Sequence, residues 1–204
     1  MKRTLRIGIT GPIGCGKSAV AGWLGEMGAT VVDADELARE STAPGEPTLD
    51  AVIERFGQRY RREDGSLDRA ALGRLVFSDP AALADLEAIV HPAVRSRIEI
   101  GMTAAEAAGA PAIAVEAIKL VEGGLAQLCD EVWLVTCDAL AQRERLVRRG
   151  ADPADAEARI AAQAGLVDRL QQFATRVIDT SGIPEAARER AQDAWRQAMS
   201  TLKT

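Results

Sequence analysis

Five short apolar stretches recur along the chain, and amphipathic helical patterns fill most of the sequence between them. Such runs are typical of strands buried on both faces of a sheet, and helices between them are typical of parallel connections. The sequence therefore predicts an α/β fold in which helices flank a five-stranded parallel sheet. The predicted strands are residues 5–9, 29–32, 111–116, 131–136 and 176–180.

The first strand runs directly into the pattern G-x-x-x-x-G-K-S at residues 11–18, called the phosphate loop below. Glycines let the backbone adopt positive φ and bring several N–H groups around one phosphate oxygen. The next helix starts at about Gly16, so its positive dipole end faces the same anion. A chance glycine-rich turn is the alternative, and the order strand, loop, amphipathic helix argues against it.

Two side chains of the loop carry the expected chemistry. Lys17 supplies a mobile charge for the β- and γ-phosphates, and the Ser18 hydroxyl completes the coordination shell of Mg²⁺. We therefore expect ATP as co-substrate together with Mg²⁺, which Ser18 would ligate. The residues expected to contact ATP here are Gly11, Gly14, Cys15, Gly16, Lys17, Ser18 and Ala19.

Carboxylates follow the second strand, at Asp33 and Asp35. The carboxyl ends of parallel strands border the crevice where α/β sheets bind ligands. One of these carboxylates near the γ-phosphate can accept a proton from an attacking hydroxyl or hold Mg²⁺ through water. Asp35 can instead cap the next helix, over residues 36–40. The third strand also ends in a carboxylate, Glu116.

Residues 41–110 interrupt the alternation of strands and helices. Asp68 precedes a helical pattern, and the pairs Asp79-Pro80 and His91-Pro92 each place a capping residue before a proline at a first helical position. We expect a mobile helical block that binds the acceptor over the phosphate loop. His91 is either a cap or packed side chain, or it positions the acceptor with Arg95 one turn on.

A helix over residues 139–149 carries Arg145, Arg148 and Arg149 on one face. Such a cluster is either a solvated basic face or part of a lid that closes on the nucleotide, and we favour the lid. The arginines of this cluster would then contact ATP and stabilise charge on the transferring phosphoryl group. Residues 150–153 would act as a hinge.

The length of 204 residues suits one domain. We expect a core formed by residues 1–40, 111–138 and 174–204. The helical acceptor subdomain covers about 41–110, and the lid covers about 139–173.

Composition excludes several classes of protein. A net charge of −5 and few aromatic residues argue against nucleic-acid binding. No apolar run is long enough for a membrane helix. We therefore expect a cytoplasmic protein without nucleic-acid or membrane partners. The three cysteines, Cys15, Cys129 and Cys137, are widely spaced, which predicts neither a disulfide framework nor a zinc site. Cys15 is either a small filler or, close to a helix N-terminus, redox-sensitive.

With these residues laid out, the chain resembles the dephospho-CoA kinases, P-loop kinases related to the nucleoside monophosphate kinases, over nearly its whole length. The resemblance rests on the phosphate loop, Val32-Asp33-Ala34-Asp35, His91-Pro92 with Arg95, and Gln142 with Arg145 and Arg149. It continues through Ala38-Arg39, Pro44-Gly45, residues 64–69, Val76-Phe77, Ala162-Gln163 and Val177-Ile178.

The resemblance implies transfer of the γ-phosphoryl group of ATP to the ribose 3′-hydroxyl of dephospho-CoA, the last step of coenzyme A synthesis. It implies Asp35 as general base with Asp33 beside it, and Lys17, Ser18 and Arg145 in phosphate chemistry. It implies Arg145 and Arg149 in the lid, where both would contact ATP, and His91, Arg95 and Asp33 near the acceptor. No obligatory protein partner is implied.

The chain departs from the family pattern at Ile118-Lys119, Thr175 and Thr180, where Pro-Leu, Asp and Asn are usual. These departures concern acceptor contacts and adenine-side contacts. Two other functions therefore stay open: a kinase for another nucleoside or nucleotide, and a regulatory protein that binds nucleotide without transfer.

Overall fold

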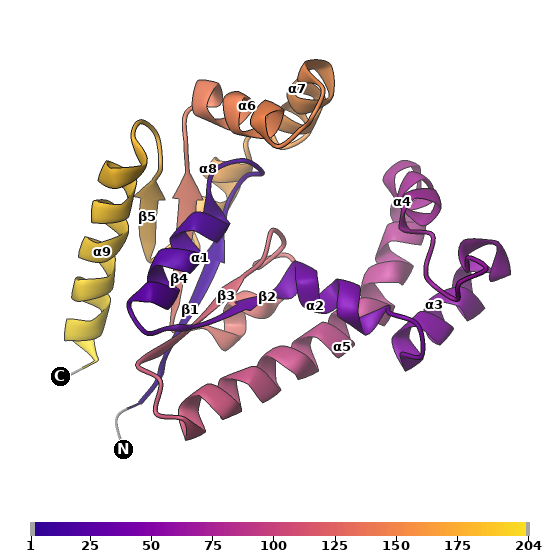
Figure 1. The fold of residues 1–204 in the computed structure, drawn as a ribbon, viewed down its shortest axis with the longest axis horizontal. Coiled ribbons are helices and arrows are strands. Elements are labelled where there is room, and N and C mark those ends of the chain that lie inside the picture. The colour runs from indigo at the N-terminus through magenta and orange to yellow at the C-terminus, as the bar shows by residue number, and fades with distance from the viewer. Residues whose placement is uncertain (1–2, 203–204) are drawn as a thin grey trace. The chain divides into compact units, whose positions relative to one another are not determined.

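The computed structural model, which describes residues 3–202, contains one five-stranded sheet in which every pairing is parallel (Figure 1). The strand order is β2-β3-β1-β4-β5. All five predicted strands are present, with ends within one residue of the prediction, so the predicted α/β fold is confirmed. The strands are β1 (Leu5–Thr10), β2 (Thr30–Asp33), β3 (Ala112–Glu116), β4 (Glu131–Thr136) and β5 (Arg176–Asp179).

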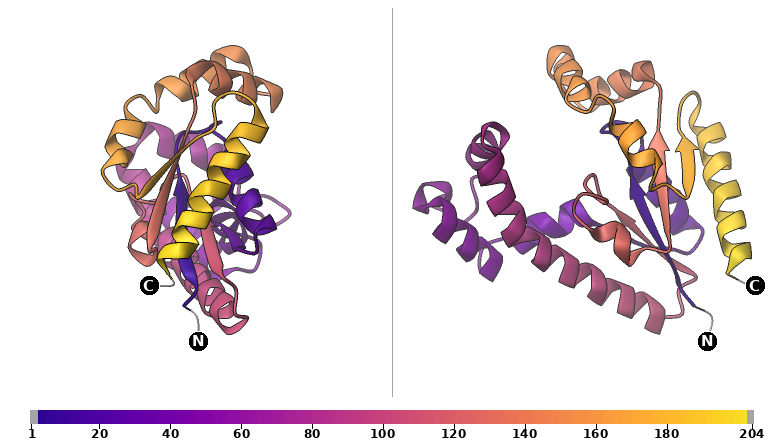
Figure 2. Two further views of the ribbon diagram at one scale, coloured as in Figure 1. Left: turned by 90° about the vertical axis from the view of Figure 1, so that its left-hand side faces the viewer. Right: turned by 180° about the vertical axis from the view of Figure 1, so that it is seen from behind.

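Side chains of β4 alternate between two apolar layers. Trp133 and Val135 belong to the larger core, with residues of α1 (Lys17–Glu26) and α9 (Pro184–Thr201). Leu134 packs against Leu166 and Leu170 at the start and end of α8 (Leu166–Gln171). Helix α9 runs alongside β5, as both views in Figure 2 show. Both faces of the sheet are therefore covered, which explains the apolar character of the whole strand.

The strand order decides which loops lie together. Strand β1 pairs with β3 on one side and β4 on the other. Because all strands are parallel, the phosphate loop after β1 lies beside the carboxyl ends of β3 and β4. The chain reaches β2 and β3 on one side of β1 and β4 and β5 on the other, so β1 is the point where the direction of the connections reverses. The sheet therefore places its ligand crevice at the phosphate loop.

The chain divides into two compact units, one formed by the residues up to Asp33 together with those from Met102 on, and one formed by Ala34–Gly101. The second unit is helical and has an apolar core of its own, which includes Leu49, Val52 and Leu72. Its elements are α2 (Ala34–Ser41), α3 (Pro47–Phe56), η1 (Gln58–Tyr60), α4 (Arg69–Ser78) and the first part of α5 (Pro80–Ala107).

Two of the predicted helix starts are confirmed and one is wrong. The Asp68 carboxylate accepts a hydrogen bond from the Ala71 N–H at the start of α4, and Asp79 accepts from the first turn of α5. No helix begins at His91-Pro92, because Pro92 lies inside α5. Proline removes one N–H from a helix without forbidding it, and the long flanking segments continue the helix through that position.

The segment after β4 forms α6 (Ala139–Arg148), α7 (Pro153–Ala161) and α8. Asp138 caps α6 by accepting from the Ala141 N–H, at 2.7 Å between the two heavy atoms. Asp152 caps α7 in the same way, and Gly150 has a φ of 91° between the two helices. Among residues 3–202, no helix has the length and apolar character that crossing a bilayer requires.

Candidate active site at the phosphate loop

The phosphate loop has the conformation that its glycines predict. Gly11, Gly14 and Gly16 have φ values of 143°, 79° and 84°. A Cβ on Gly11 would lie 2.1 Å from the carbonyl oxygen of Val135, so the loop passes too close to β4 for any side chain there. Gly16 is the N-cap residue of α1, and the unpaired N–H groups of that helix therefore open toward the loop.

Lys17 is buried in the loop, with 7% of its surface exposed. Its ammonium group donates hydrogen bonds to the carbonyl oxygens of Gly11 and Pro12, at 3.0 and 3.1 Å. These bonds hold a positive charge inside the ring of main-chain groups that the loop forms. A fixed cation and converging N–H groups are what a polyphosphate needs.

Oxygen ligands from α1, β2 and β3 lie next to the loop. The Ser18 hydroxyl donates to the carboxylate of Glu116 at 2.8 Å, and Glu116 is the last residue of β3. Asp33 is opposite Glu116 in the register of β2 and β3. No group of three His, Cys, Asp or Glu side chains that could hold a metal occurs in the described part of the chain. A hydroxyl and one or two carboxylates suit Mg²⁺, which keeps several waters and binds substrate phosphates.

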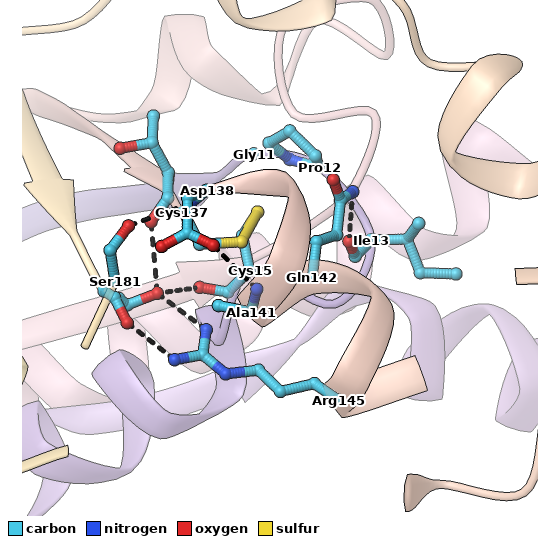
Figure 3. The surroundings of a disulfide bond; sticks show 12 residues. Gly11, Pro12, Ile13, Cys15, Cys137, Asp138, Ala141, Gln142, Arg145 and Ser181 are labelled. Carbon is cyan, nitrogen blue, oxygen red and sulfur yellow. Dashed lines mark hydrogen bonds between the residues drawn. A yellow bond between two sulfur atoms is a disulfide. The ribbon is translucent and has the colours of Figure 1, made fainter. Parts of the chain in front are cut away.

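The segment after β4 holds the phosphate loop through both main-chain polar groups of Ile13, its N–H and its carbonyl oxygen. The Gln142 side chain of α6 donates to the Ile13 carbonyl oxygen at 2.7 Å (Figure 3). The Ile13 N–H donates to the Gln163 side-chain oxygen at 2.8 Å. The two amide side chains thus fix one residue of the loop, although neither was predicted as a site residue from the residues alone.

Arg145, Arg148 and Arg149, which the sequence places on one helix face, lie in different surroundings. Arg145 points toward the loop (Figure 3). Its guanidinium donates to the Thr180 hydroxyl at 2.9 Å and to the Thr180 carbonyl oxygen at 2.6 Å. Arg148 is the exposed last residue of α6, and Arg149 is its exposed C-cap residue. The structure therefore brings Arg145 alone into the surroundings of the phosphate loop, and the contact of Arg149 with ATP remains a prediction.

Cys15 and Cys137 form a disulfide, so the prediction that the chain has no disulfide was wrong. The bond joins the phosphate loop to the residue before Asp138, the N-cap of α6 (Figure 3). The cysteines are 122 residues apart in sequence, but β1 and β4 are neighbours, and the Cα atoms lie 5.1 Å apart. Spacing could not reveal a pairing that the strand order creates.

The third cysteine is different. Burial raises the pKa of the Cys129 thiol to about 12, with Asp130 adding to the effect. The Cys129 thiol therefore stays protonated and unreactive at neutral pH.

Asp35 lies in the first turn of α2, which begins at Ala34, so Asp35 is not the N-cap residue of that helix. His91 and Arg95 lie one turn apart in α5, as their spacing predicted. The Arg95 guanidinium donates to Glu99 at 3.0 Å, also within α5. Asp35, His91 and Arg95 belong to the helical unit, and their roles remain predictions.

Four site residues were not predicted as such: Glu116, Gln142, Gln163 and Thr180. A usable signal existed for Glu116, because it is a carboxylate at the end of a strand that neighbours the phosphate loop. Gln142 and Gln163 were part of the residues that resemble the family, but no function was predicted for either. Thr180 was noted only as a departure from the family pattern. Its hydrogen bonds to Arg145 and Cys15 could not be predicted, because they depend on how the strands are ordered.

Comparison with known proteins agrees with this geometry. The family model of the dephospho-CoA kinases matches residues 5–185. The chain belongs to the dephospho-CoA kinase family. It is therefore an ATP-dependent kinase, and the expected catalytic class is confirmed.

Individual relatives support the family assignment over nearly the whole chain. A dephospho-CoA kinase of Streptomyces avermitilis is 47% identical, covering 94% of this chain and 92% of the relative. One of Symbiobacterium thermophilum is 45% identical, covering 94% of this chain and 80% of the relative. A solved structure from Thermus thermophilus is 34% identical with a TM-score of 0.81, covering 96% of this chain and 98% of that one.

Proposed function

We propose that this kinase transfers the γ-phosphoryl group of ATP to the ribose 3′-hydroxyl of dephospho-CoA, giving coenzyme A and ADP. The observation that carries the proposal is the phosphate loop itself, in which Lys17 is buried against the Gly11 and Pro12 carbonyl oxygens and Ser18 bonds Glu116. Family membership supports dephospho-CoA as acceptor. A cytoplasmic location belongs to the same proposal.

The residues present fit a Mg²⁺ ion. Ser18 would ligate the metal, and Glu116 and Asp33 would hold it through water or directly, since their oxygens come from adjacent strands. When bound, Mg²⁺ neutralises charge that develops on the phosphates. The chain's own part is to fix the hydroxyl and carboxylate oxygens at the mouth of the loop.

Phosphoryl transfer depends mostly on positioning and electrostatic stabilisation. Lys17 would bind the β- and γ-phosphates and stabilise the negative charge on them. Arg145 would add a second positive charge from α6. Asp35 would take the proton of the attacking hydroxyl, with Asp33 as the neighbouring carboxylate, and His91 and Arg95 would orient the acceptor.

A steady-state assay tests the proposal. Purified protein with ATP and Mg²⁺ should release ADP when dephospho-CoA is added, and mass spectrometry with a 3′-nucleotidase digest should place the new phosphate on the 3′-oxygen. A panel of nucleoside monophosphates should give at least 100-fold lower kcat/KM. Equal turnover of the panel would change the acceptor, and ATP binding without turnover of any acceptor would favour the regulatory protein. Lys17→Met is the inactive control.

A further inference from the structure

We infer that Thr180 is a positioning residue for ATP binding: its hydroxyl holds Arg145 against the phosphate loop. Thr180 directly follows β5 and is buried, with 2% of its surface exposed. Its position in the chain is one of the departures from the family pattern. The inference rests on the proposed function only in taking ATP as the ligand of the loop.

The Thr180 hydroxyl connects three elements. It accepts a hydrogen bond from Arg145 of α6 at 2.9 Å. It lies 2.7 Å from the Cys15 carbonyl oxygen in the phosphate loop and 3.1 Å from the Thr136 carbonyl oxygen at the end of β4, so its single proton serves the shorter of these contacts. The loop, the lid helix and the sheet therefore meet at one oxygen atom.

Main-chain atoms of Thr180 also help to hold Arg145 in place. Its carbonyl oxygen accepts the second Arg145 hydrogen bond at 2.6 Å, and its N–H donates to Thr136 at 2.8 Å. The two bonds from Arg145 use different nitrogens of one rigid guanidinium plane, which fixes the orientation of the plane as well as its position. Arg145 is thus held before any nucleotide arrives.

The held guanidinium lies at the N-terminus of α1. An ideal Cβ built on Gly16 would lie 3.5 Å from the Thr180 hydroxyl oxygen and 3.6 Å from an Arg145 nitrogen. The positive charge therefore adds to the helix dipole and the loop N–H groups at the same place. A preorganised charge stabilises an anion without the entropic cost of ordering a long side chain.

The group at this position must accept from a cation and donate to a carbonyl oxygen, and the Thr180 hydroxyl does both. Valine has the shape of threonine but would leave Arg145 with one bond and the Cys15 carbonyl oxygen with none from this side chain. Serine keeps the hydroxyl. The pair Thr180→Val and Thr180→Ser therefore separates hydrogen bonding from packing.

The experiment measures ATP affinity by calorimetry, without acceptor, for the full chain. Thr180→Val should weaken ATP binding about tenfold, and Thr180→Ser should stay within about twofold of the unmutated protein. Thr30→Val is the matched control: it makes the same chemical change at the exposed first residue of β2, at the end of the sheet opposite the phosphate loop. It should leave the affinity unchanged.

A double-mutant cycle tests whether Thr180 acts through Arg145. Arg145→Ala should itself weaken ATP binding at least tenfold, and adding Thr180→Val to it should cost less than a further twofold. Three results would each overturn the inference. The first is a double mutant whose loss of ATP affinity equals the product of the two single losses. The others are a Thr180→Val protein whose ATP affinity is within twofold of the unmutated protein, and a Thr180→Ser protein that binds ATP as weakly as Thr180→Val.

Thermal melting of each variant guards against a purely structural explanation. Thr180→Ala takes the place of Thr180→Val if the latter does not fold. If neither folds while Thr180→Ser binds ATP normally, Thr180 is a structural residue and the inference fails. Turnover is measured separately. If the ATP affinities of all variants are as expected but the unmutated protein does not phosphorylate dephospho-CoA, the acceptor assignment is wrong and the role of Thr180 in ATP binding is still supported.

Discussion

Gln142 and Ile13 lie 129 residues apart in sequence and are joined by a 2.7 Å hydrogen bond from the side-chain amide to the main-chain carbonyl oxygen. This bond connects helix α6 to the phosphate loop. The donor residue is almost completely buried, so losing the bond leaves polar atoms without solvent to replace it. The conformation of the loop is therefore set partly by the segment after β4.

Replacing Gln142 by Met should loosen the loop. The new side chain has a similar length but cannot donate to Ile13, so we expect the KM for ATP to rise about five- to tenfold and the free energy of unfolding to fall by about 1–2 kcal/mol. Steady-state kinetics and urea denaturation measure the two effects. Gln127→Met, at an exposed position, is the matched control and should change neither. An unchanged KM for ATP would show that the Gln163 hydrogen bond alone holds Ile13 in place.

Replacing Asp35 by Asn should separate binding from transfer. If Asp35 takes the proton of the acceptor hydroxyl, kcat should fall by about 10²–10⁴ while calorimetric ATP affinity stays within about twofold. Asp33→Asn is measured beside it, and the carboxylate whose loss slows kcat more is assigned as the base. Glu36→Gln, next in the same helix, should leave kcat unchanged. Full turnover by Asp35→Asn would exclude Asp35 from proton transfer.

The disulfide between Cys15 and Cys137 should stabilise the fold. Closing a loop of 122 residues restricts the unfolded chain by up to about 5 kcal/mol, so a reducing agent should lower the melting temperature by several degrees. Cys137→Ser should show no further shift on reduction. Cys129→Ala keeps the bond and should respond to reduction as the unmutated protein does, and an unmutated protein that melts identically with and without reductant would argue against the bond.

Thiol counting gives an independent measure of the same bond. Of the three cysteines, Cys129 is the one outside the disulfide. In denaturant we expect one reactive thiol per chain without reductant and three with it. In the native protein at pH 8, Cys129 should react very slowly, because its pKa is raised to about 12 by burial and the thiolate fraction is on the order of 10⁻⁴. Three thiols before reduction would contradict the structure.

A partly buried ion pair fastens β5 to β4 and should make stability depend on acid pH. Arg176 donates to both carboxylate oxygens of Glu131, at 2.7 and 3.0 Å, and Trp133 donates to one of them at 2.7 Å. Burial alone would raise the pKa of Glu131, but the hydrogen bonds from Arg176 and Trp133 outweigh it and lower that pKa below its ordinary value of 4.5. The native state therefore favours the ionised form.

The sign of the effect follows from this lowered pKa. The stabilisation is complete above about pH 5 and is lost as the pH falls through the native pKa below 4.5. Glu131→Gln should cost about 2–3 kcal/mol at pH 7 and flatten the acid side of the stability curve, as measured by urea denaturation between pH 3 and 7. Glu157→Gln, in an exposed pair with Arg143, should cost less than about 1 kcal/mol. Equal losses for the two variants would contradict the role of burial.

The sequence alone determined the features whose cause is local. The phosphate loop could be predicted because Gly11, Gly14 and Gly16 must adopt positive φ and lie next to backbone or a helix start. The five strands and the caps at Asp68 and Asp79 could be predicted for the same reason, since a few neighbouring residues define them.

The tertiary structure decided what depends on strand order and packing. Cys15 meets Cys137, and Ser18 meets Glu116, because β1 lies between β3 and β4. Pro92 lies within α5, where the local signal predicted a start, because the long helix on both sides compensates for one missing N–H group. Pairings across more than about a hundred residues are fixed by the global arrangement of the sheet, and no short stretch of sequence contains that information.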